Sequence, residues 1–95
     1  MNKYEAMFII KPDLAQDDKE SLFNQIKEVI AKNNGQVISS DIWAEKRKFY
    51  FPIKKYSEGL YYLMNFNAAS EAIRQISSTY KVNENILRFL IIRRE

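Results

Sequence analysis

The sequence predicts an α+β domain with the element order strand, helix, strand, strand, helix, strand. Four segments, residues 3–10, 36–51, 60–66 and 86–93, have the side-chain alternation and composition of strands. Two others, residues 13–34 and 67–80, repeat apolar side chains at helical spacing. This order is the ferredoxin-like, split βαβ arrangement, a four-stranded antiparallel sheet with both helices on one face. We expect one domain, residues 1–95.

The first strand and the first helix each have a side that is expected to face the core. On the strand these side chains are Tyr4, Ala6, Phe8 and Ile10. Asp13 or Asp17 is expected to cap the helix, and Gly35 to end it in the left-handed conformation. The apolar stripe of the helix consists of Leu22, Phe23, Ile26, Val29 and Ile30.

The second helix and the last strand follow the same logic. Asn67 or Ser70 is the expected cap of the helix. Its buried stripe is predicted to be Ala69, Ile73, Ile76 and Tyr80. On the last strand, one side carries Leu87, Phe89 and Ile91, and the other carries Arg88, Leu90 and Ile92.

Residues 43–62 are predicted to form a long antiparallel arm that projects beyond the helices. Residues 53–59 are its expected connection, because they are polar or turn-forming apart from one Tyr and the initial Ile. In the first half, Trp43, Arg47 and Phe49 share one side of the strand alternation. The basic residues of the arm are Lys46, Arg47, Lys48, Lys54 and Lys55. Such a run also fits a solvated strand edge, where Lys discourages aggregation.

The sheet face turned away from the helices is unusually apolar for a face exposed to water. It is expected to carry Met7, Ile9, Tyr61, Leu63, Leu90 and Ile92. A patch of roughly several hundred Å² usually marks an interaction site, so we expect these six residues to bind a protein partner. The alternative is that they are scattered apolar residues of an ordinary surface.

The composition argues against an enzyme. The chain has no histidine and no cysteine, so it lacks a nucleophile–base pair of the usual kind and cannot form a disulfide. Gly35 and Gly59 are too few for a glycine-rich phosphate loop. We therefore expect no catalytic residue, no metal site and no cofactor. No apolar run is long enough to cross a bilayer and no secretory signal is visible, so the cytoplasm or a processed organellar form is expected.

Binding of an anionic partner is allowed by the net charge of +3. One candidate class is the RNA-recognition fold of the same topology, whose third-strand signature begins with a basic residue followed by Gly and an aromatic residue. Here Glu58, Gly59 and Leu60 depart from that signature, and Tyr61 is the only aromatic residue expected on the open face. A protein-binding face combined with a basic arm that meets phosphate fits better. A protein adaptor of the same fold is the third possibility.

Three motifs in order carry a family resemblance. The first has Tyr-Glu, a strand and a Pro, at Tyr4, Glu5 and Pro12. The second includes Arg47, Phe49, Tyr50, Phe51, Pro52, Ile53, Lys55, Gly59 and Tyr61, and the third is residues 86–93. Together they resemble small-subunit ribosomal protein six of the bacterial type over the whole chain. Trp43 lies one residue farther from Pro52 than in that family, so either a bulge shifts it or it is not the equivalent residue.

The resemblance implies a structural protein of the small ribosomal subunit that binds ribosomal RNA as a heterodimer with small-subunit ribosomal protein eighteen. Phosphate contacts would come from the five basic residues of the arm, and further contacts to RNA or partner from Lys3, Arg88 and Arg93. The six apolar residues of the open face would bury the partner. Arg88 could instead pair with Glu5, and Phe49 and Phe51 are expected to pack rather than to stack on bases.

Overall fold

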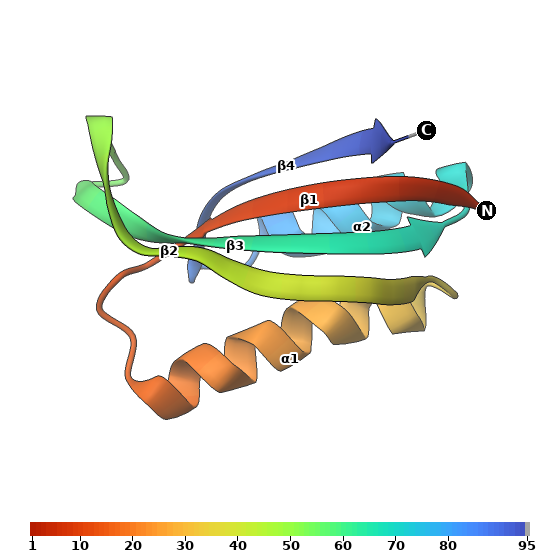
Figure 1. Ribbon diagram of the computed structural model, residues 1–95, viewed down its shortest axis with the longest axis horizontal. Coiled ribbons are helices and arrows are strands. Elements are labelled where there is room, and N and C mark those ends of the chain that lie inside the picture. The colour runs from red at the N-terminus through yellow and green to blue at the C-terminus, as the bar shows by residue number, and fades with distance from the viewer. Residues whose placement is uncertain (95) are drawn as a thin grey trace.

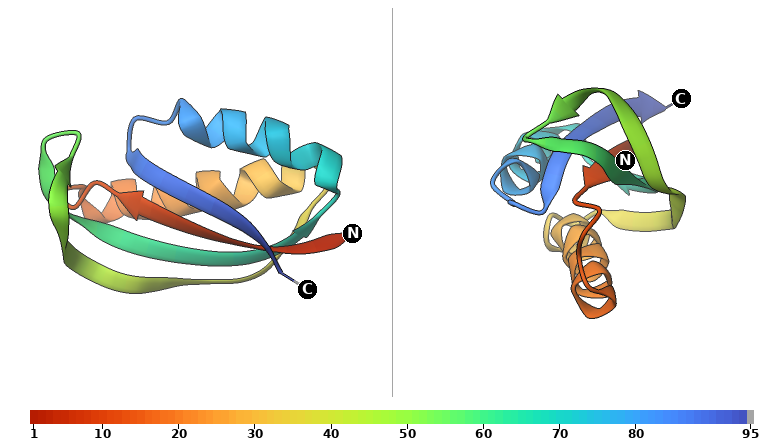
Figure 2. Two further views of the ribbon diagram at one scale, coloured as in Figure 1. Left: turned by 90° about the horizontal axis from the view of Figure 1, so that it is seen from above. Right: turned by 90° about the vertical axis from the view of Figure 1, so that its left-hand side faces the viewer.

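The computed structural model, which describes residues 1–94, has one antiparallel sheet covered on one face by helices (Figures 1 and 2). The strands lie in the order β2-β3-β1-β4. This arrangement confirms the predicted ferredoxin-like fold class. The elements are β1 (Asn2–Ile10), α1 (Gln16–Lys32), β2 (Gln36–Ile53), β3 (Tyr56–Ala68), the short 3-10 helix η1 (Ser70–Ala72), α2 (Ile73–Lys81) and β4 (Ile86–Arg94).

The core lies between the sheet and the two α-helices. Alternate residues of β1 are buried, because successive side chains of a strand point to opposite faces. Phe8 is at the centre, with its ring 4.9 Å from that of Tyr80 on α2 in an edge-to-face arrangement. The predicted core side of β1 and most of the predicted stripe of α1 are in this core, while Phe23 and Val29 pack at its border.

Helix α1 begins and ends differently from the prediction. Its N-cap is Ala15 without a side-chain hydrogen bond, so the caps predicted at Asp13 and Asp17 are wrong. Asp17 instead lies in the first turn, where its negative charge interacts favourably with the positive end of the helix dipole and stabilises the helix. At the C-terminus it is Asn34, with φ of 63°, that adopts the left-handed conformation, and Gly35 does not.

The end of α1 is a Schellman motif. The backbone N–H of Gly35 donates to the carbonyl of Ile30 at 2.8 Å, and that of Asn34 donates to the carbonyl of Ala31 at 3.1 Å. A glycine is needed at position 35 because there is no space for a side chain, and not because the backbone adopts a positive φ. A Cβ there would lie 2.7 Å from the backbone oxygen of Asn67 and 2.8 Å from Cγ2 of Ile30.

The second helical segment is shorter than predicted. Asn67 belongs to β3, and neither it nor Ser70 caps a helix; Ala69 precedes η1 without a side-chain cap and is exposed. The expectation that Ala69 belongs to the buried stripe is therefore wrong. Ile76 and Tyr80 are buried as predicted.

The β2–β3 hairpin is longer and its turn tighter than predicted. The connection is only Lys54 and Lys55, because Tyr56 already pairs with Ile53 and the residues up to Gly59 belong to β3. Both turn residues have positive φ, 48° and 74°, as a two-residue type I′ hairpin requires. The hairpin extends past the rest of the sheet and curls toward the helix side (Figures 1 and 2).

Candidate nucleic-acid and protein interface

The predicted apolar residues are brought together on the sheet face that no helix covers. In the register, Met7 of β1 lies between Leu63 of β3 and Leu90 of β4. One row further, Ile9 lies between Tyr61 and Arg88, and on the other side Glu5 lies between Asn65 and Ile92. Residues paired across neighbouring strands point to the same face, so the six predicted side chains share one surface, here called the open face.

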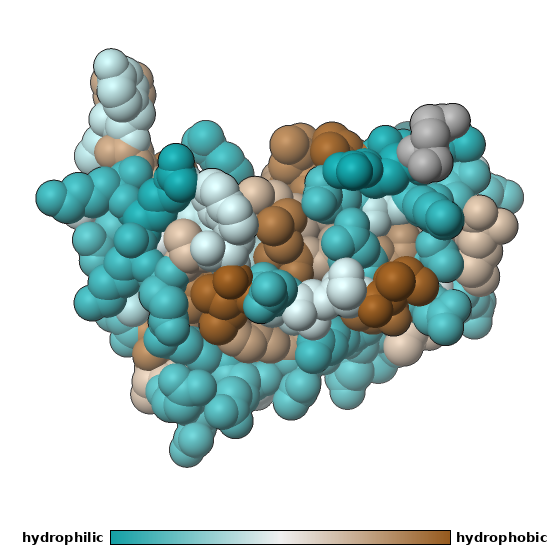
Figure 3. Space-filling model, viewed as in Figure 1, coloured by the Kyte–Doolittle hydropathy of each residue, from teal (hydrophilic) through white to brown (hydrophobic). Residues whose placement is uncertain are grey.

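The apolar side chains of the open face form separate groups rather than one continuous hydrophobic patch. Leu90 and Ile92 on the edge strand are 62% and 43% exposed, whereas Met7, Ile9 and their β3 neighbours are half-buried by one another. In the space-filling view, hydrophobic groups over the sheet alternate with hydrophilic ones (Figure 3). Such a mixed surface suits a protein partner that makes both apolar contacts and hydrogen bonds.

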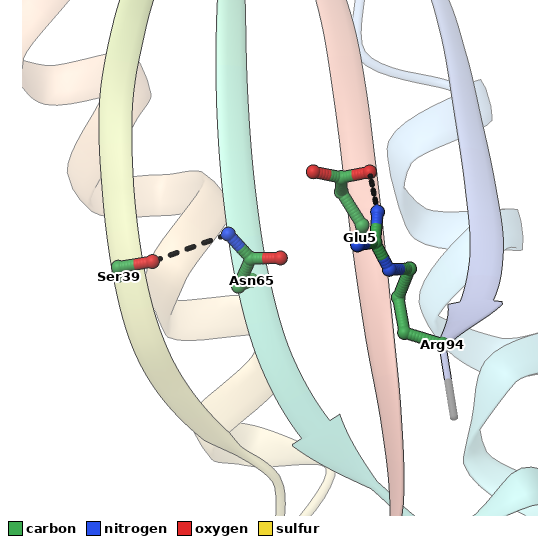
Figure 4. Close-up of polar contacts among 4 residues, drawn as sticks. All are labelled: Glu5, Ser39, Asn65 and Arg94. Atoms are coloured by element: carbon green, nitrogen blue, oxygen red, sulfur yellow. Dashed lines mark hydrogen bonds and ion pairs between the residues drawn. The ribbon is translucent and has the colours of Figure 1, made fainter.

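Two polar contacts cross the same face (Figure 4). Arg94 donates to the Glu5 carboxylate at 2.9 Å, and the Asn65 amide donates to the Ser39 hydroxyl at 3.2 Å. The pair of Glu5 with Arg88, which was the alternative role for Arg88, does not form. Arg88 lies opposite Ile9, four residues along β1, and this leaves Glu5 to Arg94.

Arg47 of the arm lies on the open face and is held there by aromatic rings. Its guanidinium carbon is 4.7 Å from the ring centre of Trp43 and 5.9 Å from that of Tyr61. The Trp43 and Tyr61 rings meet edge to face with their centres 5.5 Å apart, and the Phe49 ring centre is 6.3 Å from that of Tyr61. Cation–π contact orients the guanidinium without neutralising it, so its charge is available to an anion.

The other arm cations surround this cluster. Lys46 and Lys48 are exposed beside Arg47 on β2, and Lys54 and Lys55 are exposed at the hairpin tip. A shallow groove connects the arm to the sheet. It is lined by Ile9, Arg47, Lys48, Phe49, Tyr50, Phe51, Pro52, Ile53, Tyr61 and Arg88.

The three cations predicted to border the sheet are split between its two faces. Lys3 is exposed and lies opposite Arg94 in the register, on the open face, and Arg88 is exposed at the β4 edge. Arg93 lies opposite the buried Tyr4, so it leaves the sheet on the helix side, where its guanidinium donates to the Asn2 side chain at 3.0 Å.

Sequence reasoning missed two contributors to this surface. Trp43 is 50% exposed on the open face, and the strand register shifts between Ile42 and Ala44, so a bulge does displace it. The side-chain alternation grouped it with Arg47 and Phe49, but the bulges that bring its ring to Arg47 left no clear signal in the sequence. Phe51 is 74% exposed and touches only Tyr50 among the aromatic rings of residues 1–94, so the expectation that it packs in the chain is wrong.

Within the described residues, no three acidic, histidine or cysteine side chains come together as a metal site would require. No helix of that part of the chain has both the length and the apolar character needed to cross a membrane.

Comparison with known proteins identifies the family. The model of the family described as ribosomal protein S6 matches residues 3–93. The chain belongs to the ribosomal protein S6 family. It is 39% identical over 93 residues to small ribosomal subunit protein bS6 of Caldanaerobacter subterraneus subsp. tengcongensis, covering 98% of this chain and 97% of that one. The same protein of Clostridioides difficile is 36% identical, covering 97% and 98%.

A solved structure agrees with this assignment to the S6 family. The crystal structure of 30S ribosomal protein S6 from Thermotoga maritima superposes with a TM-score of 0.90 at 30% identity, covering 98% of this chain and 87% of that one. These relatives are named as ribosomal proteins of the small subunit, which places the chain among ribosomal proteins and not among enzymes.

Proposed function

We propose that the protein is a structural component of the small ribosomal subunit in the cytoplasm, where it binds small-subunit ribosomal RNA together with small-subunit ribosomal protein eighteen. The observation that carries this proposal is the juxtaposition of an apolar open face and a basic arm. Arg47 links the two, because it extends from the arm and lies over rings of the open face.

The arm supplies the contacts to RNA. Arg47, Lys46 and Lys48 approach phosphates along β2, and Lys54 and Lys55 approach them from the hairpin tip. Arg47 contributes the most to RNA affinity, because its guanidinium is already oriented by the Trp43 ring and can bind a phosphate through two donors. Lys3, Arg88 and Arg93 extend the positive surface along the sheet. A net charge of only +3 makes the free chain a weak RNA binder.

The open face supplies the contact to the partner protein. Burial of Leu90 and Ile92, which are the most exposed of its six apolar residues, provides the largest hydrophobic gain. Met7, Ile9 and Leu63 are half-buried beside them on β1 and β3, and the partner also packs against these side chains. The partner also adds charge and contacts to the RNA-binding surface, so RNA affinity depends on the heterodimer.

A second candidate is an RNA-recognition-type domain that stacks bases on the sheet. Trp43 favours it, because it adds a second aromatic ring beside Tyr61 on the open face. Arg47 argues against it, because its guanidinium already lies over both rings. We therefore place the phosphate-contact function first.

The test measures the affinity of the chain for small-subunit ribosomal RNA at several salt concentrations, with and without small-subunit ribosomal protein eighteen. Three to five phosphate contacts predict that log K falls with log salt at a slope of roughly −2 to −5. Binding should be tight only with the partner. Equal affinity without it would favour the RNA-recognition type, and salt-independent binding would exclude the phosphate contacts.

Two variants separate the two surfaces. Arg47→Ala should weaken RNA binding without weakening partner binding, with Lys32→Ala on α1 as the control for loss of one charge. Leu90→Asp should weaken partner binding, with Val82→Asp as its control, because Val82 is 79% exposed but follows α2, away from the open face. Equal effects of a variant and its control would contradict the assigned surface.

A further inference from the structure

A second basic surface lies on the helix side of the sheet, where α2 meets the edge strand β4. It is a hollow of about 580 Å³, here called the α2 groove. Its walls and floor are formed by Lys54, Arg74, Ser77, Ser78, Tyr80, Lys81, Ile86, Leu87, Arg88 and Phe89. The hairpin tip and the junction of α2 with β4 lie at the same end of the molecule (Figures 1 and 2).

The charges of the α2 groove are all of one sign. Lys54, Arg74, Lys81 and Arg88 come from the hairpin, α2 and β4, and no Asp or Glu is among the lining residues. None of these four cations is in an ion pair within residues 1–94, where the one such pair joins Arg94 to Glu5. Four exposed, unpaired cations around one hollow repel one another, and an anion that enters it relieves that repulsion.

The lining also offers neutral hydrogen-bond donors. Ser77 is half-buried and Ser78 exposed on α2, and their hydroxyls can donate to phosphate oxygens. The Tyr80 hydroxyl is not available, because it donates to the backbone carbonyl of Ile26 at 2.6 Å. A combination of guanidinium, ammonium and hydroxyl donors is the chemistry that recognises a phosphodiester backbone.

The conformation of the hairpin tip is a second, independent observation. Lys54 and Lys55 have φ of 48° and 74°, although Asn and Gly take up this conformation with much less strain than Lys. Strained backbone of this kind concentrates at functional sites. Here the strained turn brings Lys54 to the α2 groove, which it lines.

We propose that the α2 groove binds the phosphate backbone of RNA. The positive surface then continues from the open face, around the β4 edge and onto the helix layer. Arg88 connects the two, because it lines both the α2 groove and the groove beside the arm. This inference rests on the proposed RNA-binding function and adds Arg74 and Lys81 to its contacts.

The first test compares two double variants that remove the same charge. Arg74→Ala/Lys81→Ala removes two exposed cations from the α2 groove, and Lys19→Ala/Lys32→Ala removes two lysines, one half-buried and one exposed, from α1. RNA affinity is measured against salt in the presence of small-subunit ribosomal protein eighteen. The groove variant should lower the magnitude of the slope of log K against log salt by roughly 1.4–1.8, from ~0.7–0.9 per lost contact. The control should leave it unchanged.

The outcomes separate the two proposals. If the wild-type heterodimer shows no salt-sensitive RNA binding, the proposed function fails and this inference fails with it. If the wild type binds but both double variants keep its slope, only the α2 groove is overturned. All four substituted residues are on helix surfaces. The free energy of unfolding of each variant, measured by urea denaturation, should therefore be close to that of the wild type.

The second test locates the RNA directly. The chain has no cysteine, so Ser78→Cys introduces a single attachment point at the α2 groove, and Ser21→Cys introduces one on α1 as its matched control. With hydrogen peroxide as oxidant and ascorbate as reductant, an iron chelate attached at residue 78 should generate hydroxyl radicals that cleave the bound RNA, while the same chelate at residue 21 should not. Cleavage from both positions or from neither would overturn the assignment of the groove.

Discussion

The guanidinium carbon of Arg47 lies 4.7 Å from the centre of the Trp43 ring, although the two residues are separated by an irregular stretch of β2. The register of β2 against β3 shifts between Ile42 and Ala44 and again before Arg47. Bulges bend a strand and re-aim its side chains. The irregularity therefore places an aromatic ring beneath a cation that regular alternation alone would put farther away.

This contact predicts that Trp43 acts on RNA binding through Arg47. Trp43→Ala should weaken the RNA affinity of the heterodimer by about two- to fivefold, because an exposed cation–π contact contributes about 0.5–1 kcal/mol. Trp43→Phe should retain most of the affinity. The measurement is a double-mutant cycle, in which Trp43→Ala should have little effect on an Arg47→Ala background. An equal loss on both backgrounds would show that Trp43 contacts RNA or partner on its own.

The hairpin tip predicts a conflict between stability and binding. Lys54→Asn/Lys55→Gly should raise the free energy of unfolding by about 0.5–1 kcal/mol, because these residues adopt positive φ with less strain. The same change should reduce RNA affinity, because it removes two cations. Urea denaturation and RNA titration of one protein check both statements. A double variant at Lys19 and Lys32 controls for charge, and unchanged or lower stability in the tip variant would contradict the strain argument.

The fold was predictable because its signals are local and repeat along the chain. The alternation of Tyr4, Ala6 and Phe8 and the helical spacing of Leu22, Ile26 and Ile30 define which sides meet in the core. The same alternation predicts the open face, because the strand residues that do not face the core must point to the other side of the sheet. Element ends were less predictable, since Asn34 and Gly35 are both common at a helix C-terminus and only tertiary contacts decide between them.

The candidate site was predictable in part for a similar reason. Its six apolar residues follow from strand parity, which the sequence displays. The α2 groove does not, because Lys54, Arg74 and Arg88 are far apart in the sequence and come to one groove only in the folded chain, from the hairpin, α2 and β4. The tight turn at Lys54 was also hidden, because nothing in the two lysines suggests positive φ.

The two glycines predict different responses to a methyl group. Gly35→Ala should lower the free energy of unfolding by about 2–3 kcal/mol, because the new Cβ meets the backbone oxygen of Asn67 at 2.7 Å and backbone atoms cannot move locally. Gly59→Ala should lower the free energy of unfolding by only about 1 kcal/mol, because its nearest contact, at 2.7 Å, is the far end of the Phe49 side chain, which can shift more easily than backbone. Chemical denaturation of both variants measures the difference.

Gly59 also offers a rescue experiment. Phe49→Leu removes the ring atoms that crowd the new methyl group, so Gly59→Ala should cost less on that background than on the wild type. An equal cost on both backgrounds would assign the crowding to the other neighbours, Cγ2 of Ile9 at 2.9 Å and the backbone oxygen of Ile10 at 3.1 Å.

The Tyr80 hydroxyl predicts how stability depends on alkaline pH. It donates to the carbonyl oxygen of Ile26 at 2.6 Å in the core, and burial, with a smaller effect of nearby Tyr62, raises the pKa of Tyr80 above its usual value. Tyr80→Phe should lower the free energy of unfolding by about 1 kcal/mol at neutral pH, the usual contribution of one hydrogen bond.

The sign of the pH effect follows from the raised pKa. Folding favours the protonated phenol, so the contribution of Tyr80 is fully present below the unfolded-state pKa of about 10 and is lost as pH rises toward the folded-state pKa. The stability advantage of the wild type over Tyr80→Phe should therefore shrink by about 1.4 kcal/mol per pH unit above pH ~10. Urea denaturation of both proteins between neutral and alkaline pH measures this difference and cancels the titration of Tyr62 and the lysines. A difference that stays constant across that range would show that the Tyr80 hydroxyl is not held as a buried, neutral donor.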